Sequence, residues 1–486
     1  MRFNVLSTTR NIKAKAKKNG RLSARDACDI LQVQYPENMD LDFKYTMICC
    51  FEGVFIKDCL FVHYERDDDS VAVDAMTKGA KAILCSHQIG SYPCIIVTDV
   101  LAALNKLLQY IYSPISIPST VVTGSCGKTT TKNFVNCVYS TTYNTFCNIT
   151  NGNTFEYLGF EIQRLDSRAK LFVQEVNESD PFNAKNCSEV LKPEIALITN
   201  MDKSHIGELG GEENIIKAIC DITAGMDENG VVIINADDKN SVKPTFRQKV
   251  ITVSIKDRDA DCYADIIEAN ASHTIFDLYY KDEKARVTVP IGGVHNVYNA
   301  QMAYIAGRLN NISSDRIIKG LKKYKPLGFR QNVYKSLGNL IYADCYNASA
   351  KSVGYAIQYL NEMNSKGKKI AVLGDIAEID GYELDTYREI AKSISDSDID
   401  ILVTYGKDSR MIHHWISKKV QMFHETSQSE LIKRIKSFNS KSDCYLFKAS
   451  RSMHLDVVIQ KVFPMAYYKG MFPVAWKYFK WNLRTL

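Results

Sequence analysis

The sequence predicts an α/β protein of three domains. Short apolar runs alternate with helical patterns along the 486 residues, an order typical of parallel sheets covered by helices on both faces. A chain of 486 residues allows about three domains of roughly 100–200 residues each. Charged residues make up 24% of the chain and aromatic residues 10%, as in ordinary globular proteins, so each domain can bury a core of its own.

The three domains are expected to differ in kind. Residues 1–118 should form a small N-terminal α/β domain, and residues 119–326 a central domain built on a parallel sheet. Residues 327–486 repeat the alternation of strands and helices, which predicts a Rossmann-like C-terminal domain. Within the central domain, residues 263–290 switch to a two-residue alternation that indicates an antiparallel hairpin.

The individual elements follow from apolar runs and helical periodicity. In the first region, apolar runs predict strands at 59–62, 82–85 and 94–98, and a periodic pattern predicts a helix at 101–112. The central strands are expected at 120–123, 171–176, 194–199, 230–235 and 250–255, with helices that include 128–140, 213–227 and 295–309. The last region should contribute strands at 369–373, 400–404 and 443–447.

Charge and composition exclude several classes of protein. The net charge of +6 is small for this length, and Lys and Arg are not clustered as a nucleic-acid-binding surface requires. Fourteen cysteines show neither a CxxC pair nor zinc-type spacing, which indicates reduced thiols. The N-terminus is basic without the apolar run of a signal peptide, and no run of about 18 apolar residues occurs. We therefore expect a cytoplasmic protein that binds no nucleic acid.

The strongest local signal is a glycine-lysine-threonine segment between a predicted strand and a predicted helix, with the sequence TGSCGKTTT at residues 123–131. Gly124 and Gly127 let the backbone curl so that successive N–H groups face an anion, and the helix N-terminus adds positive partial charge. Lys128 would reach the β- and γ-phosphates of ATP, and the Thr129 hydroxyl would bind Mg²⁺. The segment therefore predicts that the central domain is a P-loop ATPase domain.

This phosphate loop, residues 123–131, is two residues shorter than the general form with four residues between Gly and Gly-Lys. Ser125 in the loop and Thr130 in the first helical turn are further candidates for contacting phosphates, and Cys126 is expected to be a spacer. The alternative interpretation is a tight strand-to-helix turn with a capping threonine. We favour the phosphate site because strand, loop and helix coincide.

Several further segments follow the loop in a fixed order. They are ITN at 198–200, HIG at 205–207, HNVYNA at 295–300, residues 344–348, VLGD at 372–375 and residues 448–453. Together with residues 122–132, this order resembles the Mur ligases, the ATP-dependent enzymes that build the peptide of bacterial cell-wall precursors. Within that family it looks most similar to the branch that adds D-alanyl-D-alanine to a UDP-N-acetylmuramoyl tripeptide. The resemblance covers residues 57–462.

The resemblance implies a reaction that forms an amide bond. In the family, an acceptor carboxylate attacks the γ-phosphate of ATP, and an amine then attacks the acyl-phosphate and releases phosphate. Because two anions must meet, cations such as Mg²⁺ have to offset their repulsion. The expected acceptor is a UDP-N-acetylmuramoyl peptide and the expected amine is D-alanyl-D-alanine, which would place the reaction in peptidoglycan precursor synthesis.

The resemblance also assigns catalytic and metal-binding candidates. Lys128, Glu175, His205 and Arg330 match residues that act in catalysis, and Thr129, Glu175 and His205 match the magnesium ligands. Glu175 ends a predicted strand and His205 follows another, the place where ligands collect in open α/β sheets. Taken alone, Glu175 could be a solvated carboxylate and His205 a hydrogen-bonded loop histidine.

Nucleotide and substrate contacts are assigned in the same way. Asn296 would contact the adenine, with Asn299 on the same face of its helix, although Asn also caps helices well. Arg330 would face the phosphates and Asp344 the ribose once the C-terminal domain closes, and surface salt bridges are the alternative role for both. The segment 448–451 could equally be a simple helix start. The substrate candidates are Asp375, Glu378, Lys448, Ser450 and Arg451.

The chain departs from the family at three places. Most members carry a lysine, carbamylated by CO₂, that bridges toward a second metal; Ile219 stands there, and Lys217 would lie about 200° away around the helix. A second metal should therefore be weakly bound, absent or held differently. Asn177 follows Glu175 where a glycine is usual. The N-terminal region lacks the segments with which relatives grip a uridine nucleotide, which leaves recognition of a UDP-linked acceptor open.

Several alternatives stay open. A diverged ligase that joins an amino acid or peptide to a different carboxylate acceptor fits the altered N-terminal region, and a nucleotide-binding partner subunit without ligase activity fits Ile219. The small net charge argues against a nucleic-acid-dependent ATPase. Beyond Pro464, aromatic and basic residues alternate in a tail that could contact a membrane surface. We favour packing of this tail on the third domain.

Overall fold

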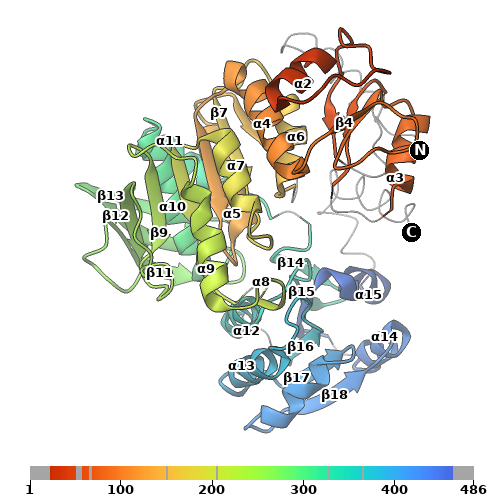
Figure 1. The fold of residues 1–486 in the computed structure, drawn as a ribbon. Helices are drawn as coiled ribbons and strands as arrows, with labels where there is room; N and C mark the ends of the chain where they lie inside the picture. Colours follow the sequence, from red (N-terminus) through yellow and green to blue (C-terminus); the bar gives the residue numbers. More distant parts are fainter. Residues whose placement is uncertain are drawn as a thin grey trace.

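The computed structural model describes residues 22–50, 57–64, 68–148, 152–203, 206–326, 328–363, 366–439 and 441–463. These residues form three β-sheets that follow one another along the chain (Figure 1). The predicted α/β class and its three-part architecture are confirmed. The aromatic-basic tail beyond Pro464 lies outside the described residues.

The N-terminal sheet has four short parallel strands in the order β1-β2-β3-β4. The strands are β1 (Ile48–Cys49), β2 (Leu60–Val62), β3 (Ala82–Cys85) and β4 (Cys94–Ile96), and the helices are α2 (Ala24–Leu31), α3 (Ser70–Thr77) and α4 (Val100–Tyr112). Helix α4 begins where the Asp99 carboxylate accepts the N–H of Ala102 (2.9 Å). Its buried Leu104 and Leu107 join a core that also includes central-sheet residues, so the first two regions share one hydrophobic core.

The central sheet has nine strands in the order β13-β12-β11-β10-β9-β8-β5-β7-β6. They are β5 (Ser119–Thr123), β6 (Thr145–Cys147), β7 (Leu171–Glu175), β8 (Ile195–Ile198), β9 (Val231–Asn235), β10 (Lys249–Ser254), β11 (Cys262–Ala269), β12 (Thr274–Tyr280) and β13 (Glu283–Val289). The strands β5 to β11 pair in parallel, whereas β11, β12 and β13 pair antiparallel, which confirms the change of pattern seen in residues 263–290.

Helices cover both faces of the central sheet (Figure 1). The helices of this region are α5 (Lys128–Tyr139), α6 (Phe155–Gln163), α7 (Asn183–Leu191), α8 (Ile206–Leu209), α9 (Glu212–Cys220), α10 (His295–Leu309) and α11 (Ser314–Leu321). Successive side chains of a strand point to opposite faces, so Val121 packs in one core and Val122 in the other. Because both faces are buried, these strands read as continuous apolar runs in the sequence.

The C-terminal sheet has six strands in the order β14-β15-β19-β16-β17-β18, of which only β14 is antiparallel to its neighbour. The strands are β14 (Asn332–Ser336), β15 (Asn339–Ala343), β16 (Lys369–Gly374), β17 (Ile401–Tyr405), β18 (Gln421–Glu425) and β19 (Cys444–Lys448). The helices are α12 (Ala350–Glu362), α13 (Glu383–Ser395), α14 (Gln428–Ser437) and α15 (Leu455–Val462).

The carboxyl ends of β5, β7 and β8 lie at one edge of the central sheet, because these neighbouring strands are parallel. The C-terminal sheet and its helix α12 lie beyond α8, on the side that this edge faces (Figure 1). Residues from both domains line one cavity there. Among the helices that the structure describes, none is long and apolar enough to cross a membrane.

Candidate functional site

The phosphate loop joins β5 to α5 in a conformation that requires glycine twice. Gly124 has φ of +117° and Gly127 of +86°, both in the left-handed region. A Cβ on Gly124 would lie 2.4 Å from Thr199 Oγ1, and one on Gly127 would lie 2.8 Å from Asn299 Oδ1. The loop therefore fits only without side chains at these positions, and it directs the N-terminus of α5 at Lys128 to the cavity.

The chain after β8 holds the loop in place. The backbone carbonyl of Asn200 accepts the N–H of Ser125 (3.0 Å), and the side-chain Oδ1 of Asn200 accepts the N–H of Cys126 (3.0 Å). The Ser125 hydroxyl donates to the Asp202 carbonyl (2.9 Å). Burial raises the pKa of the Cys126 thiol, so this side chain stays neutral beside Ser349 Oγ (3.4 Å). Hydrogen bonds to Asn200 and Asp202 thus fix the loop before a ligand arrives.

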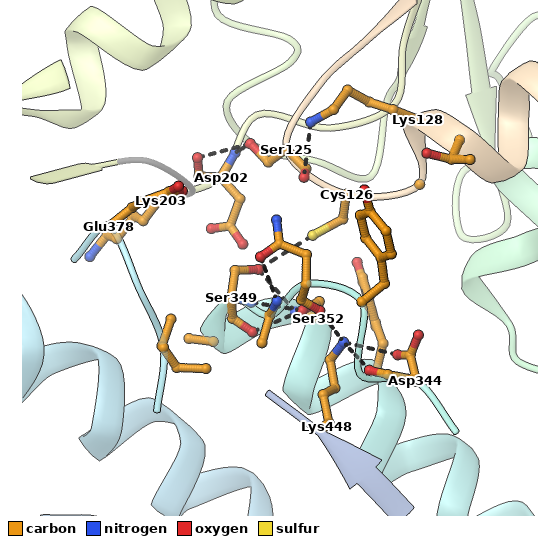
Figure 2. A pocket seen from close by; sticks show the side chains of 18 of the residues that line it. Ser125, Cys126, Lys128, Asp202, Lys203, Asp344, Ser349, Ser352, Glu378 and Lys448 are labelled. Carbon is orange, nitrogen blue, oxygen red and sulfur yellow. Dashed lines mark hydrogen bonds and ion pairs between the residues drawn. The ribbon is translucent and has the colours of Figure 1, made fainter. Parts of the chain in front are cut away.

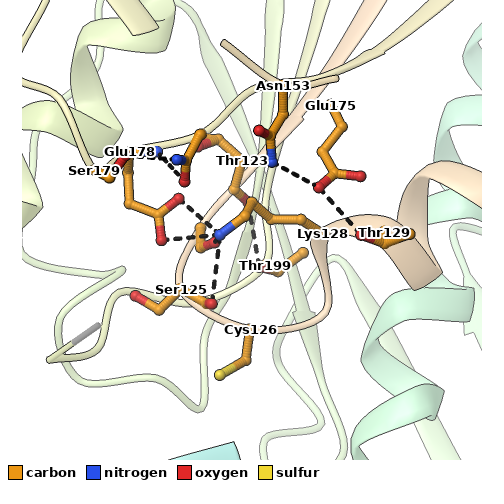
Figure 3. Close-up of polar contacts among 12 residues, drawn as sticks. Thr123, Ser125, Cys126, Lys128, Thr129, Asn153, Glu175, Glu178, Ser179 and Thr199 are labelled. Carbon is orange, nitrogen blue, oxygen red and sulfur yellow. Dashed lines mark hydrogen bonds and ion pairs between the residues drawn. The ribbon is translucent and has the colours of Figure 1, made fainter. Parts of the chain in front are cut away.

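Lys128 does not extend freely into the cavity (Figure 3). Its Nζ donates to both oxygens of Glu178 (2.7 and 2.9 Å) and to the Gly124 carbonyl (2.6 Å). Glu178 follows β7 by three residues and its side chain is fully buried. The lysine that the sequence assigns to the phosphates is therefore held by an internal carboxylate.

Glu175 ends β7 beside the start of α5 (Figure 3). Its Oε1 accepts the Thr129 hydroxyl and an N–H of Asn153, each at 3.1 Å. Its Oε2 lies 3.3 Å from Nζ of Lys132, a lysine that is almost completely buried. Burial alone would raise the pKa of Glu175, but the charges of Lys132, Arg330 and Lys128 outweigh burial and lower it. Glu175 is therefore a carboxylate at neutral pH.

These groups fit a magnesium ion. Glu175 Oε2 is buried and accepts no hydrogen bond, although Lys132 Nζ lies 3.3 Å from it, and the Thr129 hydroxyl donates to the other oxygen of the same carboxylate. Mg²⁺ is commonly held by one or two carboxylates together with substrate phosphates, so a larger protein cage is not required. Among the described residues, no group of three or more His, Cys, Asp or Glu side chains is arranged to hold a metal. His205, the third expected ligand, lies outside the described residues.

A cavity of about 290 Å³ joins the two domains at this edge (Figure 2). The central domain lines it with the phosphate loop, Glu175 and the start of α10, and the C-terminal domain lines it with the loops after β15 and β16. Gly124, which the sequence also assigns to the phosphates, does not line the cavity. The predicted site residues that line the cavity are Ser125, Gly127, Lys128, Thr129, Thr130, Glu175, Asn296, Asn299, Arg330, Asp344, Glu378 and Lys448.

The start of α10 lies against the phosphate loop. Asn299 accepts the Thr131 hydroxyl (3.0 Å) and donates to Asn296 Oδ1 (3.1 Å). Asn296 in turn donates to Gln331 Oε1 (3.0 Å), which belongs to the C-terminal domain. His295 stacks on Tyr355 of α12 with ring centroids 4.9 Å apart, and burial lowers its pKa to about 4. A neutral aromatic surface and an amide therefore border the cavity where the resemblance places adenine.

Arg330 and Asp344 are brought to the cavity as expected. The Arg330 guanidinium stacks on Tyr346 at 3.9 Å, and its charge reaches Glu175. Asp344 forms an ion pair with the buried Lys448 (2.9 Å), and its other oxygen accepts the N–H of Gln331 (3.0 Å). Lys448 thus orients Asp344 and lines the cavity itself.

Three substrate candidates do not line the cavity. The Asp375 carboxylate accepts backbone N–H groups of residues 407–409 at 2.7–3.1 Å, so it shapes the loop after β17. Ser450 accepts the N–H of Ala377 (2.8 Å), and Arg451 pairs with the Asp456 carboxylate (3.2 Å). Asp375 and Ser450 therefore satisfy backbone N–H groups of the loops around the cavity, and Arg451 compensates a buried charge.

Ile219 and Lys217 lie on different faces of helix α9. The Ile219 side chain is fully buried in the hydrophobic core and offers no metal ligand. Lys217 is exposed on another face of the helix. Neither residue therefore brings a second cation-binding group to the phosphate loop.

The C-terminal domain is closed onto the central domain. The N–H of Gly207 donates to the carbonyl of Glu378 (3.2 Å), and Lys351 pairs with Asp238 (3.2 Å). Glu378 has φ of +64°, and Gly207 packs so closely that a Cβ would lie 2.7 Å from Asp380 N. These contacts hold the loop after β16 over the cavity.

Several site residues were missed in the sequence. Glu178 and Asn153 lie in loops with no motif, and only their place after or beside a strand end hints at a role. Lys132 could have been found, because it lies one helical turn after Lys128 on α5 and so shares its face. Tyr346 lies within the matched segment 344–348, but its stacking on an arginine depends on tertiary packing.

Fold and site together define a P-loop enzyme whose second α/β domain closes over the nucleotide-binding edge of the central sheet. Residues 122–307 match the family model of the Mur ligase middle domain, and residues 330–451 match that of the Mur ligase, glutamate ligase domain. The UDP-N-acetylmuramoyl-tripeptide–D-alanyl-D-alanine ligase of Bacillus subtilis (strain 168) is 31% identical over 406 residues, which cover 81% of this chain and 87% of that protein. The chain belongs to the Mur ligase family, and it is an ATP-dependent ligase that forms amide bonds.

Further relatives agree with this membership. The ligase of the same name from Escherichia coli (strain K12) is 28% identical over 413 residues, covering 83% of this chain and 90% of that protein. The crystal structure of MurF from Acinetobacter baumannii superposes with a TM-score of 0.81 at 23% identity, covering 91% of this chain and 98% of that one. The crystal structure of MurF from Thermotoga maritima in complex with ADP superposes with a TM-score of 0.74 at 22% identity, covering 86% of this chain and 96% of that one. These two structures show the same fold.

Proposed function

We propose that the protein joins D-alanyl-D-alanine to the terminal carboxylate of a UDP-N-acetylmuramoyl peptide, with cleavage of ATP to ADP and phosphate. The observation that carries this proposal is the single cavity that unites the phosphate loop and Glu175 with Arg330, Asp344 and Lys448 of the other domain. Relatives named for that reaction align over 81% and 83% of this chain, which supports the choice of substrates.

The residues at the loop would bind and orient ATP. Once released from Glu178, Lys128 can meet the β- and γ-phosphates, and the N-terminus of α5 adds positive partial charge. Asn296 would contact the adenine, and Asp344, held by Lys448, would face the ribose. A Mg²⁺ ion held by Thr129 and Glu175 would neutralise charge where the γ-phosphate meets the acceptor carboxylate.

The C-terminal domain would complete the reaction site. Arg330 adds a fixed cation opposite Glu175, where negative charge gathers as the acceptor carboxylate attacks the γ-phosphate and ADP leaves. The amine then attacks the acyl carbon, an amide bond forms and inorganic phosphate departs. Because the loop after β16 covers the cavity, water is kept from hydrolysing the acyl-phosphate. Glu378 also lines the cavity and would face the ammonium group of the incoming amine.

An ADP-release assay followed by mass spectrometry of the product tests the proposal. The wild-type protein should release ADP only when a UDP-N-acetylmuramoyl tripeptide and D-alanyl-D-alanine are both present, and the product mass should equal their sum minus water. Lys128→Ala is the matched negative control. ADP release without any amine, or no product with a range of acceptors, would contradict ligation. A product formed only with another carboxylate acceptor would identify a diverged ligase.

A further inference from the structure

The Glu178 carboxylate holds Lys128 beside the phosphate loop, although it takes no direct part in the proposed reaction. The two oxygens of Glu178 lie 2.7 and 2.9 Å from Lys128 Nζ. The Glu178 side chain is fully buried, whereas 12% of the lysine side chain is exposed. Glu178 does not line the cavity and Lys128 does, so the carboxylate lies behind the lysine (Figure 3). A bound triphosphate would approach Lys128 from the opposite side.

A triphosphate and Glu178 need the same ammonium group. Lys128 has three N–H donors, and the structure directs them to Glu178, to the carbonyl of Gly124 and, at 3.4 Å, to the carbonyl of Ser125. A phosphate oxygen must displace one of these acceptors or draw the lysine away from them. Separating a buried carboxylate from its cation is costly. This cost weakens the binding of a nucleotide that must draw Lys128 away from Glu178.

A divalent cation changes this balance. The groups that fit Mg²⁺, Thr129 and Glu175, lie on the other side of the loop from Glu178, next to the start of α5 (Figure 3). A divalent cation beside Thr129 and Glu175 neutralises two of the negative charges of the triphosphate. Lys128 can then share its N–H donors between a phosphate oxygen and Glu178. We propose that Glu178 is a positioning residue that competes with the triphosphate for Lys128 and thereby makes nucleotide binding depend on a divalent cation. This inference rests on the proposed role of Lys128 at the phosphates.

Equilibrium binding of a non-hydrolysable ATP analogue, with EDTA or with Mg²⁺, tests the inference on the full-length protein. In EDTA, Glu178→Gln should bind the analogue about tenfold more tightly than the wild type, because the competitor for Lys128 is gone. With Mg²⁺, the two affinities should agree within about threefold. Equal or weaker binding by Glu178→Gln in EDTA would overturn the inference. Glu178→Asp shortens the side chain by one methylene and so moves the carboxylate away from Lys128. Its affinity in EDTA should lie between those of the wild type and Glu178→Gln. This variant tests the inference if Glu178→Gln does not fold.

Two further variants separate competition from other effects. Glu161→Gln removes the charge of another buried glutamate, which pairs with Arg164 (3.1 Å) on α6 and does not line the cavity, and it should match the wild type under both conditions. In a Lys128→Ala background, Glu178→Gln should change affinity by less than about twofold. A tenfold gain that persists without Lys128 would show direct repulsion and overturn competition. These results do not depend on the amide product, so they are distinguishable from failure of the proposed function, and a wild type that binds no nucleotide would overturn both.

Discussion

Replacing Arg330 by alanine tests whether the C-terminal domain contributes to chemistry after ATP is bound. The guanidinium stacks on Tyr346 at 3.9 Å and is one of the three cations that lower the pKa of Glu175, so its charge reaches the metal site. Removing one preorganised electrostatic group from a reaction site costs a factor of roughly 10²–10³ in kcat, or about 3–4 kcal/mol of transition-state stabilisation. The phosphate loop and Lys128 stay intact, so the Kd for an ATP analogue should change by less than about threefold.

The assay combines steady-state ADP release with fluorescence or calorimetric binding of the ATP analogue. Arg451 provides the matched control, because it also lies near the Tyr346 ring, 5.9 Å from its centroid, but pairs with Asp456 and does not line the cavity. Arg451→Ala should lower kcat by less than about threefold. Equal loss of nucleotide binding and turnover in Arg330→Ala would refute the reasoning, since Arg330 would then belong to ground-state binding.

The remaining predictions concern stability and domain closure. Lys132→Met leaves the buried Glu175 with one cation fewer, so the free energy of unfolding at neutral pH should fall by about 3 kcal/mol. Urea titration measures this change, and an unchanged value would show that the ion pair does not stabilise the protein. Gly207→Ala places a Cβ 2.7 Å from Asp380 N and so separates α8 from the loop after β16. The kcat should fall about tenfold while nucleotide affinity is retained. An unaltered kcat would show that the close packing of Gly207 against this loop is not needed for catalysis. Because burial lowers the pKa of His295 from 6.5 to about 4, the unfolded chain binds more protons between these values, and stability should fall as the pH drops through this window, by up to about 3 kcal/mol. His295→Gln should flatten that dependence in pH-resolved unfolding, whereas an identical slope would contradict the assignment.

Much of the fold was predictable because strands buried on both faces leave continuous apolar runs. The strand expected at 120–123 is β5 (Ser119–Thr123), and the one expected at 171–176 is β7 (Leu171–Glu175). The helix expected at 213–227 ends earlier, at Cys220, and continues as a 3-10 turn over Asp221–Thr223. Gly225 packs there against the backbone of Ser188 on α7, a tertiary contact that periodicity cannot show.

In the site, too, residues in contiguous motifs could be predicted, whereas contacts between residues distant in the sequence could not. The phosphate loop could be recognised because its glycines, lysine and threonine are contiguous and follow a strand. Asp375 was assigned to the substrate from a motif, yet its carboxylate serves three backbone N–H groups of a loop more than thirty residues away in the sequence. Glu178 escaped notice, although the unusual Asn177 drew attention to its segment, because pairing with Lys128 needs the folded sheet edge.

In the proposed reaction, an acceptor carboxylate attacks the γ-phosphate of ATP held at the phosphate loop. The most direct measurement uses an acceptor peptide whose terminal carboxylate carries ¹⁸O in both oxygens, with ATP, Mg²⁺ and D-alanyl-D-alanine, and follows the label by mass spectrometry. This route predicts that each inorganic phosphate released carries a single ¹⁸O from the acceptor and that the amide keeps the other. Phosphate free of ¹⁸O alongside a normal amide product would show that no acyl-phosphate forms and would contradict it.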